Sequence, residues 1–294
     1  MSRLFRVILL LTIAVAASGQ QPVKVDVRLV NTIVTVTDSA GRYVVGLGKD
    51  DFTIEDDGTP QPICHFSFDN QTPVSVGIVF DTSGSMQSKM RTAVSAVNRF
   101  VRTVHVDDDI FLMTFAGDVE LRQDFTDNRD QLAKAMTNMR ANGGTKLYDA
   151  LGQGMGKIKD GRQKKRAILL ITDGQDTDSQ TKYAEVLKSI RESELLLYPL
   201  GIKPLTASQR DGVDLDVLQS FATESGGRAF LIADSVVGNA GQIDKVLNQI
   251  ADELRSQYTI GFYPAHPDDG KFHRLTVRTR TGLFARTRPG YTAR

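Results

Sequence analysis

Three short polar segments of this chain carry oxygen-bearing side chains of the kind that bind cations. "DTSGS" supplies Asp81, Ser83 and Ser85, "NGGTKLYDA" supplies Thr145, and "ITDG" supplies Asp173. Two carboxylates and three hydroxyls, without histidine or cysteine, suit a hard divalent cation better than zinc or copper. Because most of these oxygens are neutral, they favour Mg²⁺, with Mn²⁺ or Ca²⁺ as alternatives.

Two other roles compete for the segment that contains Asp81, Ser83 and Ser85. Ser85 stands just before the helical pattern "MQSKMRTAV" and could cap that helix, but a cap explains neither Asp81 nor Ser83. A nucleophilic serine needs a base nearby, and "TSGSM" lacks the glycine spacing of a G-x-S-x-G turn. The four histidines of the chain are all expected away from these side chains. We therefore expect a metal site and no enzyme.

The elements that must position these residues form an alternating pattern over residues 73–256. "VSVGIVF", directly before Asp81, is a continuous apolar run typical of a strand covered on both faces. "RAILLIT" leads in the same way to Asp173, and helical patterns separate the strands. Repeated β-α units predict an α/β fold, a doubly wound, mostly parallel sheet with helices on both faces. Ligands of such sheets bind beyond the carboxyl ends of the strands, where Asp81 and Asp173 lie.

Both ends of the chain have a β-rich pattern instead. Residues 21–72 contain "VKVDVRLVNTIVTVTD", which alternates apolar and polar positions, and residues 257–294 contain "YTIGFYP" and "FHRLTVRTR". We infer that the two ends pack together as one small, sandwich-like all-β domain, into which the α/β domain is inserted.

Residues 1–20 have the pattern of a secretory signal peptide. Two arginines precede the apolar run "VILLLTIAVAA", and the small residues of "AASGQ" follow it. The alternative is an uncleaved membrane anchor, although the run is short for a membrane span. No later segment reaches that length, so we expect an exported protein, periplasmic or extracellular, that is soluble after cleavage. The net charge of +1 gives no indication of nucleic-acid or membrane binding.

Cys64 is the only cysteine, so no disulfide can form within the chain. Its strand-like context, "PICHFSF", predicts a small buried apolar side chain rather than a reactive thiol.

Residues 73–256 resemble a von Willebrand factor A domain, on the ordered motifs "DTSGS", "GGT" and "ITDG". The resemblance implies a metal-ion-dependent adhesion site in which Ser83, Ser85 and Thr145 contact the metal through their hydroxyls. Asp81 and Asp173 would act largely through bridging water. The remaining coordination position would accept a Glu or Asp carboxylate of a protein partner. The whole chain, with its "RPGY" ending, is also similar to secreted, von Willebrand factor A-related proteins of soil bacteria.

Two further acidic residues follow Asp173 in "DGQDTDS". Asp176 and Asp178 could line the rim of the partner site or bind a second cation, although such a run is also typical of a solvated loop.

The C-terminal segment offers a second candidate surface. Arg274, Arg278 and Arg280 share one face of a predicted strand, opposite Leu275 and Val277. This face is either an ordinary solvent-exposed one or a site for an anionic partner such as an envelope polymer.

Two functions from different classes remain. One is an exported adhesion-type module that captures a protein through its metal. The other is a cell-envelope scaffold that binds through its β domain and uses the metal only to hold loops together.

Overall fold

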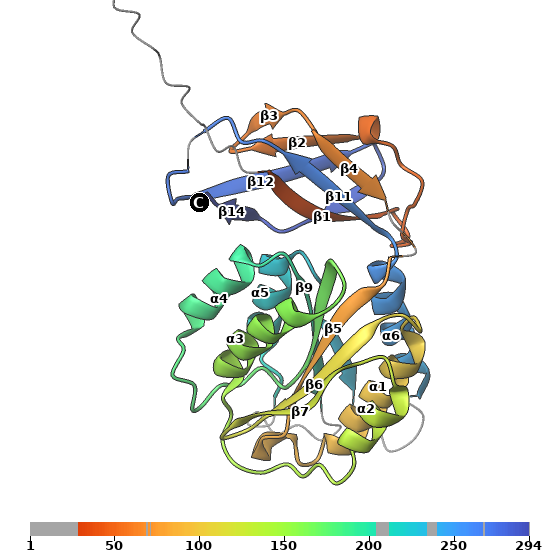
Figure 1. Ribbon diagram of the computed structural model, residues 1–294, viewed down its shortest axis with the longest axis vertical. Helices are drawn as coiled ribbons and strands as arrows, with labels where there is room; N and C mark the ends of the chain where they lie inside the picture. Colours follow the sequence, from red (N-terminus) through yellow and green to blue (C-terminus); the bar gives the residue numbers. More distant parts are fainter. Residues whose placement is uncertain are drawn as a thin grey trace, which may run out of the picture.

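The structure, a computed structural model, describes residues 29–68, 70, 72–203, 212–233, 240–266 and 268–293. The predicted signal peptide lies outside the described residues. Figure 1 shows two parts, which we call the α/β domain (residues 74–254) and the β domain (residues 30–68 and 257–292). None of the helices in the described ranges has the length and apolar character that crossing a bilayer requires.

The α/β domain is built on a six-stranded sheet with the strand order β10-β9-β8-β5-β6-β7. Strand β5 lies at the centre, parallel to both β6 and β8, and only β7 is antiparallel to its neighbour. All eight residues of β5 are buried, as expected for its continuous apolar sequence. The strands are β5 (Val74–Asp81), β6 (Asp109–Phe115), β7 (Val119–Thr126), β8 (Lys165–Ile171), β9 (Leu196–Lys203) and β10 (Phe230–Ala233).

Helices cover both faces of this sheet (Figure 1). Alternate residues of β5 enter different cores: Ile78 and Phe80 pack with α1 and α6, and Val79 packs with α3. The prediction of a doubly wound, mostly parallel sheet is therefore confirmed. The α-helices are α1 (Met90–Thr103), α2 (Arg129–Ala135), α3 (Leu147–Lys157), α4 (Tyr183–Glu192), α5 (Leu215–Ser225) and α6 (Ala240–Leu254). The short 3₁₀ helices are η1 (Lys49–Asp51), η2 (Gly84–Met86) and η3 (Ile158–Asp160).

The β domain consists of two four-stranded sheets with the orders β13-β1-β11-β4 and β14-β12-β2-β3. Each sheet mixes strands from the two ends of the chain, and β11 pairs with β1 and β4 from the N-terminal end. Their inner side chains share one apolar core, which includes Val34, Ile54 and Tyr258. The inference that the chain ends form one β domain is thus confirmed. The strands are β1 (Val30–Thr37), β2 (Phe52–Asp56), β3 (Thr59–Gln61), β4 (His65–Phe68), β11 (Gln257–Phe262), β12 (Phe272–Thr279), β13 (Phe284–Arg286) and β14 (Gly290–Thr292).

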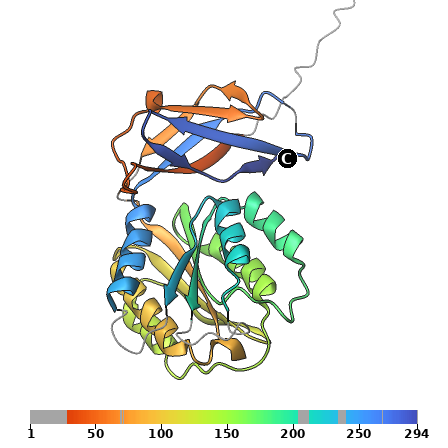
Figure 2. The same cartoon turned by 180° about the vertical axis from the view of Figure 1, so that it is seen from behind.

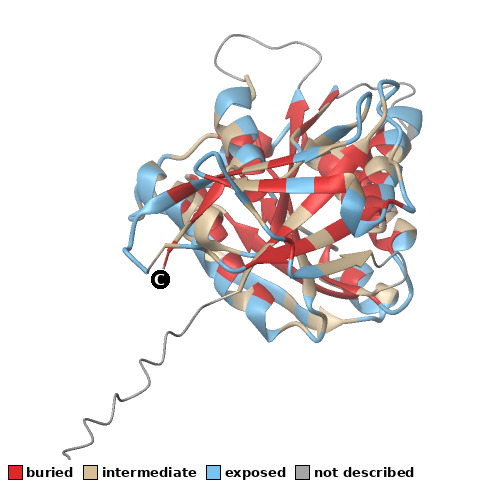
Figure 3. Cartoon of the chain, turned by 90° about the horizontal axis from the view of Figure 1, so that it is seen from above, coloured by how far each residue is buried: buried red, intermediate tan, exposed pale blue. Residues whose placement is uncertain are grey.

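The α/β domain begins and ends on the side that faces the β domain. Figures 1 and 2 show the β domain beside the N-terminal end of β5 and the C-terminal end of α6. The C-terminal end of β5, followed by η2, lies at the far end of the α/β domain. Figure 3 shows buried residues running through the interiors of both parts. The two candidate binding surfaces of the chain therefore lie far apart.

The prediction that Cys64 is buried is wrong, because its thiol is exposed. The preceding residue, Ile63, packs into the β-domain core instead. Successive side chains of an extended segment point to opposite sides, so Cys64 points outward.

Candidate metal centre

Three loops meet at the C-terminal edge of the six-stranded sheet, and backbone hydrogen bonds join them. Thr82 O accepts from Asn142 N at 2.9 Å, and Gly84 N donates to Gly143 O at 3.0 Å. Thr145 O accepts from Thr177 N at 2.9 Å and from Asp178 N at 3.1 Å. The loop that carries Thr145 is thus fixed between the loop after β5 and the loop after β8.

Asp81 is the last residue of β5, and its side chain is fully buried. Its Oδ1 accepts from Ser83 N at 2.8 Å, and its Oδ2 accepts from Thr172 Oγ1 at 2.6 Å. Burial raises the pKa of Asp81 to about 6, against the opposing effect of these hydrogen bonds. The carboxylate is therefore costly to keep charged unless a cation lies nearby.

Ser83 and Ser85 present their hydroxyl oxygens 3.0 Å apart, with Ser83 buried and Ser85 exposed. Ser85 lies within η2, whereas α1 begins only at Met90. No side-chain hydrogen bond caps η2 or α1 at the N-cap residue. The alternative role of Ser85 as the cap of this helix therefore finds no support in the structure.

Asp173 follows β8 by two residues and is also fully buried. Its Oδ2 accepts from the ammonium of Lys89 at 2.9 Å, and neither side chain is exposed to solvent. Lys89 was not anticipated from the sequence. A signal was present, because a lysine directly before the first residue of a helix lies where the helix dipole disfavours a cation.

Thr145 is buried, and its backbone N–H donates to Thr177 Oγ1 at 2.9 Å. The two glycines before it are required by the close fit of the loops. Gly143 has φ +82°, a value that favours glycine, and a Cβ on Gly144 would lie 1.7 Å from Asp178 Oδ2. The glycine pair of "NGGT" thus lets Thr145 approach the loop after β8.

Asp176 and Asp178 have different surroundings in the loop after β8. Asp176 Oδ1 accepts from Tyr148 N at 3.2 Å and from Ser179 Oγ at 2.6 Å. It thus provides an acceptor for a backbone N–H in the first turn of α3. Asp178 is exposed and lies against Gly144. Only Asp178 is thus placed as an exposed acidic group at the rim.

The donor set at this edge fits a hard divalent cation. All five predicted ligands offer oxygen, they come from three loops that hydrogen bonds join, and two of them are buried carboxylates. Asp81, Asp173 and Lys89 together carry one negative charge, and a bound divalent cation would change this to one positive charge. Such a centre would attract a carboxylate.

The arginine face of β12 is exposed, and acidic residues pair with part of it. Arg278 lies 3.2 Å from Glu55, and Arg280 lies 3.2 Å from Asp51. Arg274 is exposed as well. The positive charge available to an anionic partner is therefore smaller than the sequence alone indicates.

Known proteins resemble this chain in both sequence and fold. Inter-alpha-trypsin inhibitor heavy chain H2 of Mus musculus is 27% identical over 212 residues, which cover 64% of this chain and 21% of the mouse protein. The von Willebrand factor type A structure from Catenulispora acidiphila has a TM-score of 0.53 at 14% identity, covering 80% of this chain and 71% of that chain. BatB from Bacteroides thetaiotaomicron has a TM-score of 0.51 at 20% identity, covering 62% of this chain and 98% of that chain.

The family assignment rests on the sequence of the α/β domain. Residues 76–175 match the model of the von Willebrand factor type A domain, and this range contains all five predicted ligands. The mouse protein is far longer than the aligned segment, so the similarity concerns this region alone. The chain therefore contains a von Willebrand factor type A domain, a member of a family of adhesion and protein-binding modules.

Proposed function

We propose that this chain is an exported, metal-dependent protein-binding module. Asp81, Ser83, Ser85, Thr145 and Asp173 would hold Mg²⁺ at the C-terminal edge of the sheet, and a Glu or Asp side chain of a protein partner would complete the coordination. The metal would supply an electrophilic centre for that carboxylate. Binding, rather than catalysis, is the function that this arrangement supports best.

The observation that carries the proposal is the pair of fully buried carboxylates, Asp81 and Asp173, with a single buried ammonium between the loops. Two buried acids beside one base leave an uncompensated negative charge, which is unfavourable away from water. A divalent cation removes this cost. It also leaves the centre with a positive charge, which gives an incoming carboxylate a charge-assisted bond.

Catalysis has little support at this edge of the sheet. Asp176 is held by Tyr148 N and Ser179, and Asp81 by Ser83 and Thr172. Both carboxylates are thus committed to hydrogen bonds within the loops, whereas a general base must reach a substrate proton.

The cell-envelope scaffold remains the second candidate function, because the arginine face of β12 is exposed. In that case the metal would only join loops, and an anionic envelope polymer would bind the β domain. The ion pairs of Arg278 with Glu55 and of Arg280 with Asp51 make this the weaker candidate.

Titration calorimetry of the full chain with Mg²⁺ tests the metal site. We expect binding by the unaltered protein and its loss in Asp81→Ala and in Thr145→Ala. Thr137→Ala, which removes a hydroxyl bonded to Lys134 O at the end of α2, is the matched control. Equal Mg²⁺ affinity in the unaltered protein and in both site variants would overturn the proposal. Circular dichroism of each variant shows that it remains folded.

A second experiment separates the module from the scaffold. Envelope extract is applied to the immobilised protein with Mg²⁺ or with EDTA, and the combined variant Arg274→Ala, Arg278→Ala and Arg280→Ala is compared with it. Capture that is lost in EDTA but kept by the arginine variant supports the module. Capture that survives EDTA but is lost in the arginine variant supports the scaffold.

A further inference from the structure

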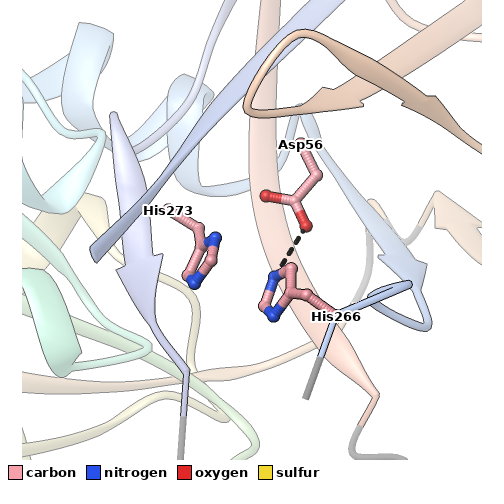
Figure 4. A group of neighbouring side chains, drawn as sticks. All are labelled: Asp56, His266 and His273. Carbon is pink, nitrogen blue, oxygen red and sulfur yellow. Dashed lines mark hydrogen bonds and ion pairs between the residues drawn. The ribbon is translucent and has the colours of Figure 1, made fainter. Parts of the chain in front are cut away.

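A second cluster of potential metal ligands lies in the β domain, away from the sheet edge described above. Figure 4 shows Asp56, His266 and His273 converging from three segments. Asp56 ends β2, His273 is in β12, and His266 is in the connection between β11 and β12. One potential ligand atom of each residue lies within 4.8 Å of the other two.

Asp56 carries an unsatisfied oxygen in this cluster. The residue is only 3% exposed. Its Oδ2 accepts from Tyr291 at 2.8 Å and lies 3.1 Å from His266 Nε2, whereas its Oδ1 has no hydrogen-bond partner among the described residues. A buried carboxylate oxygen without a donor is unfavourable, and a metal ion is one of the few partners that would satisfy it.

The two imidazole rings bring nitrogen donors to the same place. They stack with centroids 3.6 Å apart and planes 8° from parallel. His273 Nδ1 lies 2.9 Å from Asp57, and its Nε2 lies 3.1 Å from Asp269. An imidazole that binds a metal through one nitrogen usually keeps a carboxylate on the other. A metal bound to His273 would therefore replace one of these two carboxylate contacts and leave the other to orient the ring.

The charge of the cluster favours a cation. Asp56, Asp57 and Asp269 surround two imidazoles, and Lys271 pairs with Asp269 at 3.4 Å while its own side chain is 79% exposed. With neutral rings these three carboxylates outnumber that one cation. A divalent ion would balance this excess of two negative charges.

We propose that Asp56, His266 and His273 form a zinc-binding site of the β domain, separate from the Mg²⁺ site of the α/β domain. Two imidazoles and one carboxylate are a ligand set typical of Zn²⁺, with a fourth position for water or a neighbouring carboxylate. Asp56 binds through Oδ1, while Tyr291 keeps its hydrogen bond to Oδ2. Ring nitrogens bind a metal in the plane of the ring, so the His266 ring turns out of the stack.

The site has a structural consequence. Asp56 and His273 belong to the sheet β14-β12-β2-β3, whereas His266 belongs to the segment that crosses into this sheet from β11. The zinc ion would link that connection to the ends of β2 and β12, the two inner strands of this sheet. Metal binding would therefore stabilise the β domain without touching the partner site.

A proton is the competing occupant of this cluster. Burial favours the neutral form of His273, but its hydrogen bonds to Asp269 and Asp57 outweigh burial and raise the pKa of the ring. A protonated His273 would satisfy those two carboxylates, yet it would leave Asp56 Oδ1 without a donor. The test is therefore made at mildly alkaline pH, where a proton competes less with the metal for the imidazole nitrogens.

The experiment is a competition titration of the metal-free full chain with Zn²⁺ and a chromophoric chelator. We expect one tight site, and we expect His266→Gln to weaken it by at least about tenfold. His65→Gln, which removes an exposed histidine of β4 next to Cys64, is the matched control and keeps full affinity. Asp81→Ala also keeps full affinity, so failure of the Mg²⁺ proposal would leave this result unchanged.

Melting curves and anomalous X-ray scattering at the zinc edge complete the test. Zn²⁺ should raise the melting temperature of the unaltered protein and of His65→Gln, but not that of His266→Gln. The anomalous peak should lie between Asp56, His266 and His273. Unchanged Zn²⁺ affinity in His266→Gln, loss of affinity in His65→Gln, or a peak elsewhere would overturn the proposal and leave the cluster as a proton-binding one.

Discussion

Lys89 is buried without solvent contact beside Asp173, in a domain whose other buried groups are mostly apolar. Removing a charge from water is costly, and the pair with Asp173 repays only part of that cost. Lys89 therefore acts mainly on the net charge of the candidate metal centre. With Lys89 the metal-free centre carries one negative charge, and without it the charge would be two.

Lys89→Met tests this role, since methionine has a similar length and no charge. We expect the metal-free variant to lose about 3–5 kcal/mol of unfolding free energy, because Asp173 is left buried and unpaired. The variant that folds should bind Mg²⁺ more tightly than the unaltered protein. Urea unfolding in EDTA measures the first effect, and calorimetry measures the second.

Lys188→Met is the control for this prediction. Lys188 is on the exposed side of α4, where it lies 4.0 Å from Glu192. Its loss should change the unfolding free energy by less than about 1 kcal/mol. A Lys89→Met protein as stable as this control would show that the buried pair contributes nothing.

At the scale of elements, the turn after β8 decides where Asp173 points. Gly174 has φ +85°, and a Cβ added to it would meet Asp214 O at 2.8 Å. Asp173 O accepts from Asp214 N at 2.7 Å, which joins this turn to the start of α5. A left-handed glycine is therefore needed for Asp173 to turn back toward Lys89 and the loop after β5.

Gly174→Ala should destabilise the protein and weaken Mg²⁺ binding together. A side chain at this φ, in contact with backbone, costs about 1–3 kcal/mol. Gly156→Ala in α3, where an added Cβ meets nothing within 4 Å, is the control and should be neutral or stabilising by up to about 1 kcal/mol. The measurements are thermal melting and calorimetry, and equal behaviour of the two variants would contradict the prediction.

The pattern of apolar residues was sufficient to predict the strands and helices of the α/β domain. The apolar runs before Asp81 and Asp173 specify buried parallel strands, and this places both residues at the C-terminal edge of the sheet. The resemblance to the von Willebrand factor A domain added Thr145 to the predicted site, and its loop is hydrogen-bonded to the loops after β5 and β8. The ion pair of Lys89 with Asp173 and the cluster of Asp56 with two histidines were not predictable in the same way. Each joins residues distant in the chain, through side-chain contacts that leave no local pattern.

At the scale of the whole molecule, Glu253 joins the two domains. It is fully buried near the end of α6. Tyr198 of β9 donates to it at 2.9 Å, and Tyr43 of the β domain donates to it at 3.1 Å. Arg286 of β13 also pairs with it. One carboxylate thus couples the stability of both domains.

Glu253→Gln keeps the shape of this side chain and removes its charge. We expect a loss of about 2 kcal/mol of unfolding free energy, less than for a fully buried pair because Arg286 is partly exposed. Glu224→Gln, which breaks the partly exposed pair with Arg191, should cost less than about 1 kcal/mol. Chemical unfolding followed by fluorescence and circular dichroism compares the two, and a larger loss in Glu224→Gln would refute the coupling.

The pairing of β4 with β11 sets an order for folding. Tyr258 lies directly opposite Phe68 in the register of these strands, yet the whole α/β domain separates them in the chain. Closing so long a loop from an unfolded chain is entropically costly and slow. Once the α/β domain has formed, Val74 and Leu254 are held at the same end, and the loop is already closed. Strands β2 and β3 can pair with each other early, but β1 and β4 pair only with β11 and β13. These two N-terminal strands therefore remain unpaired until the α/β domain has formed and residues 257–286 have been made.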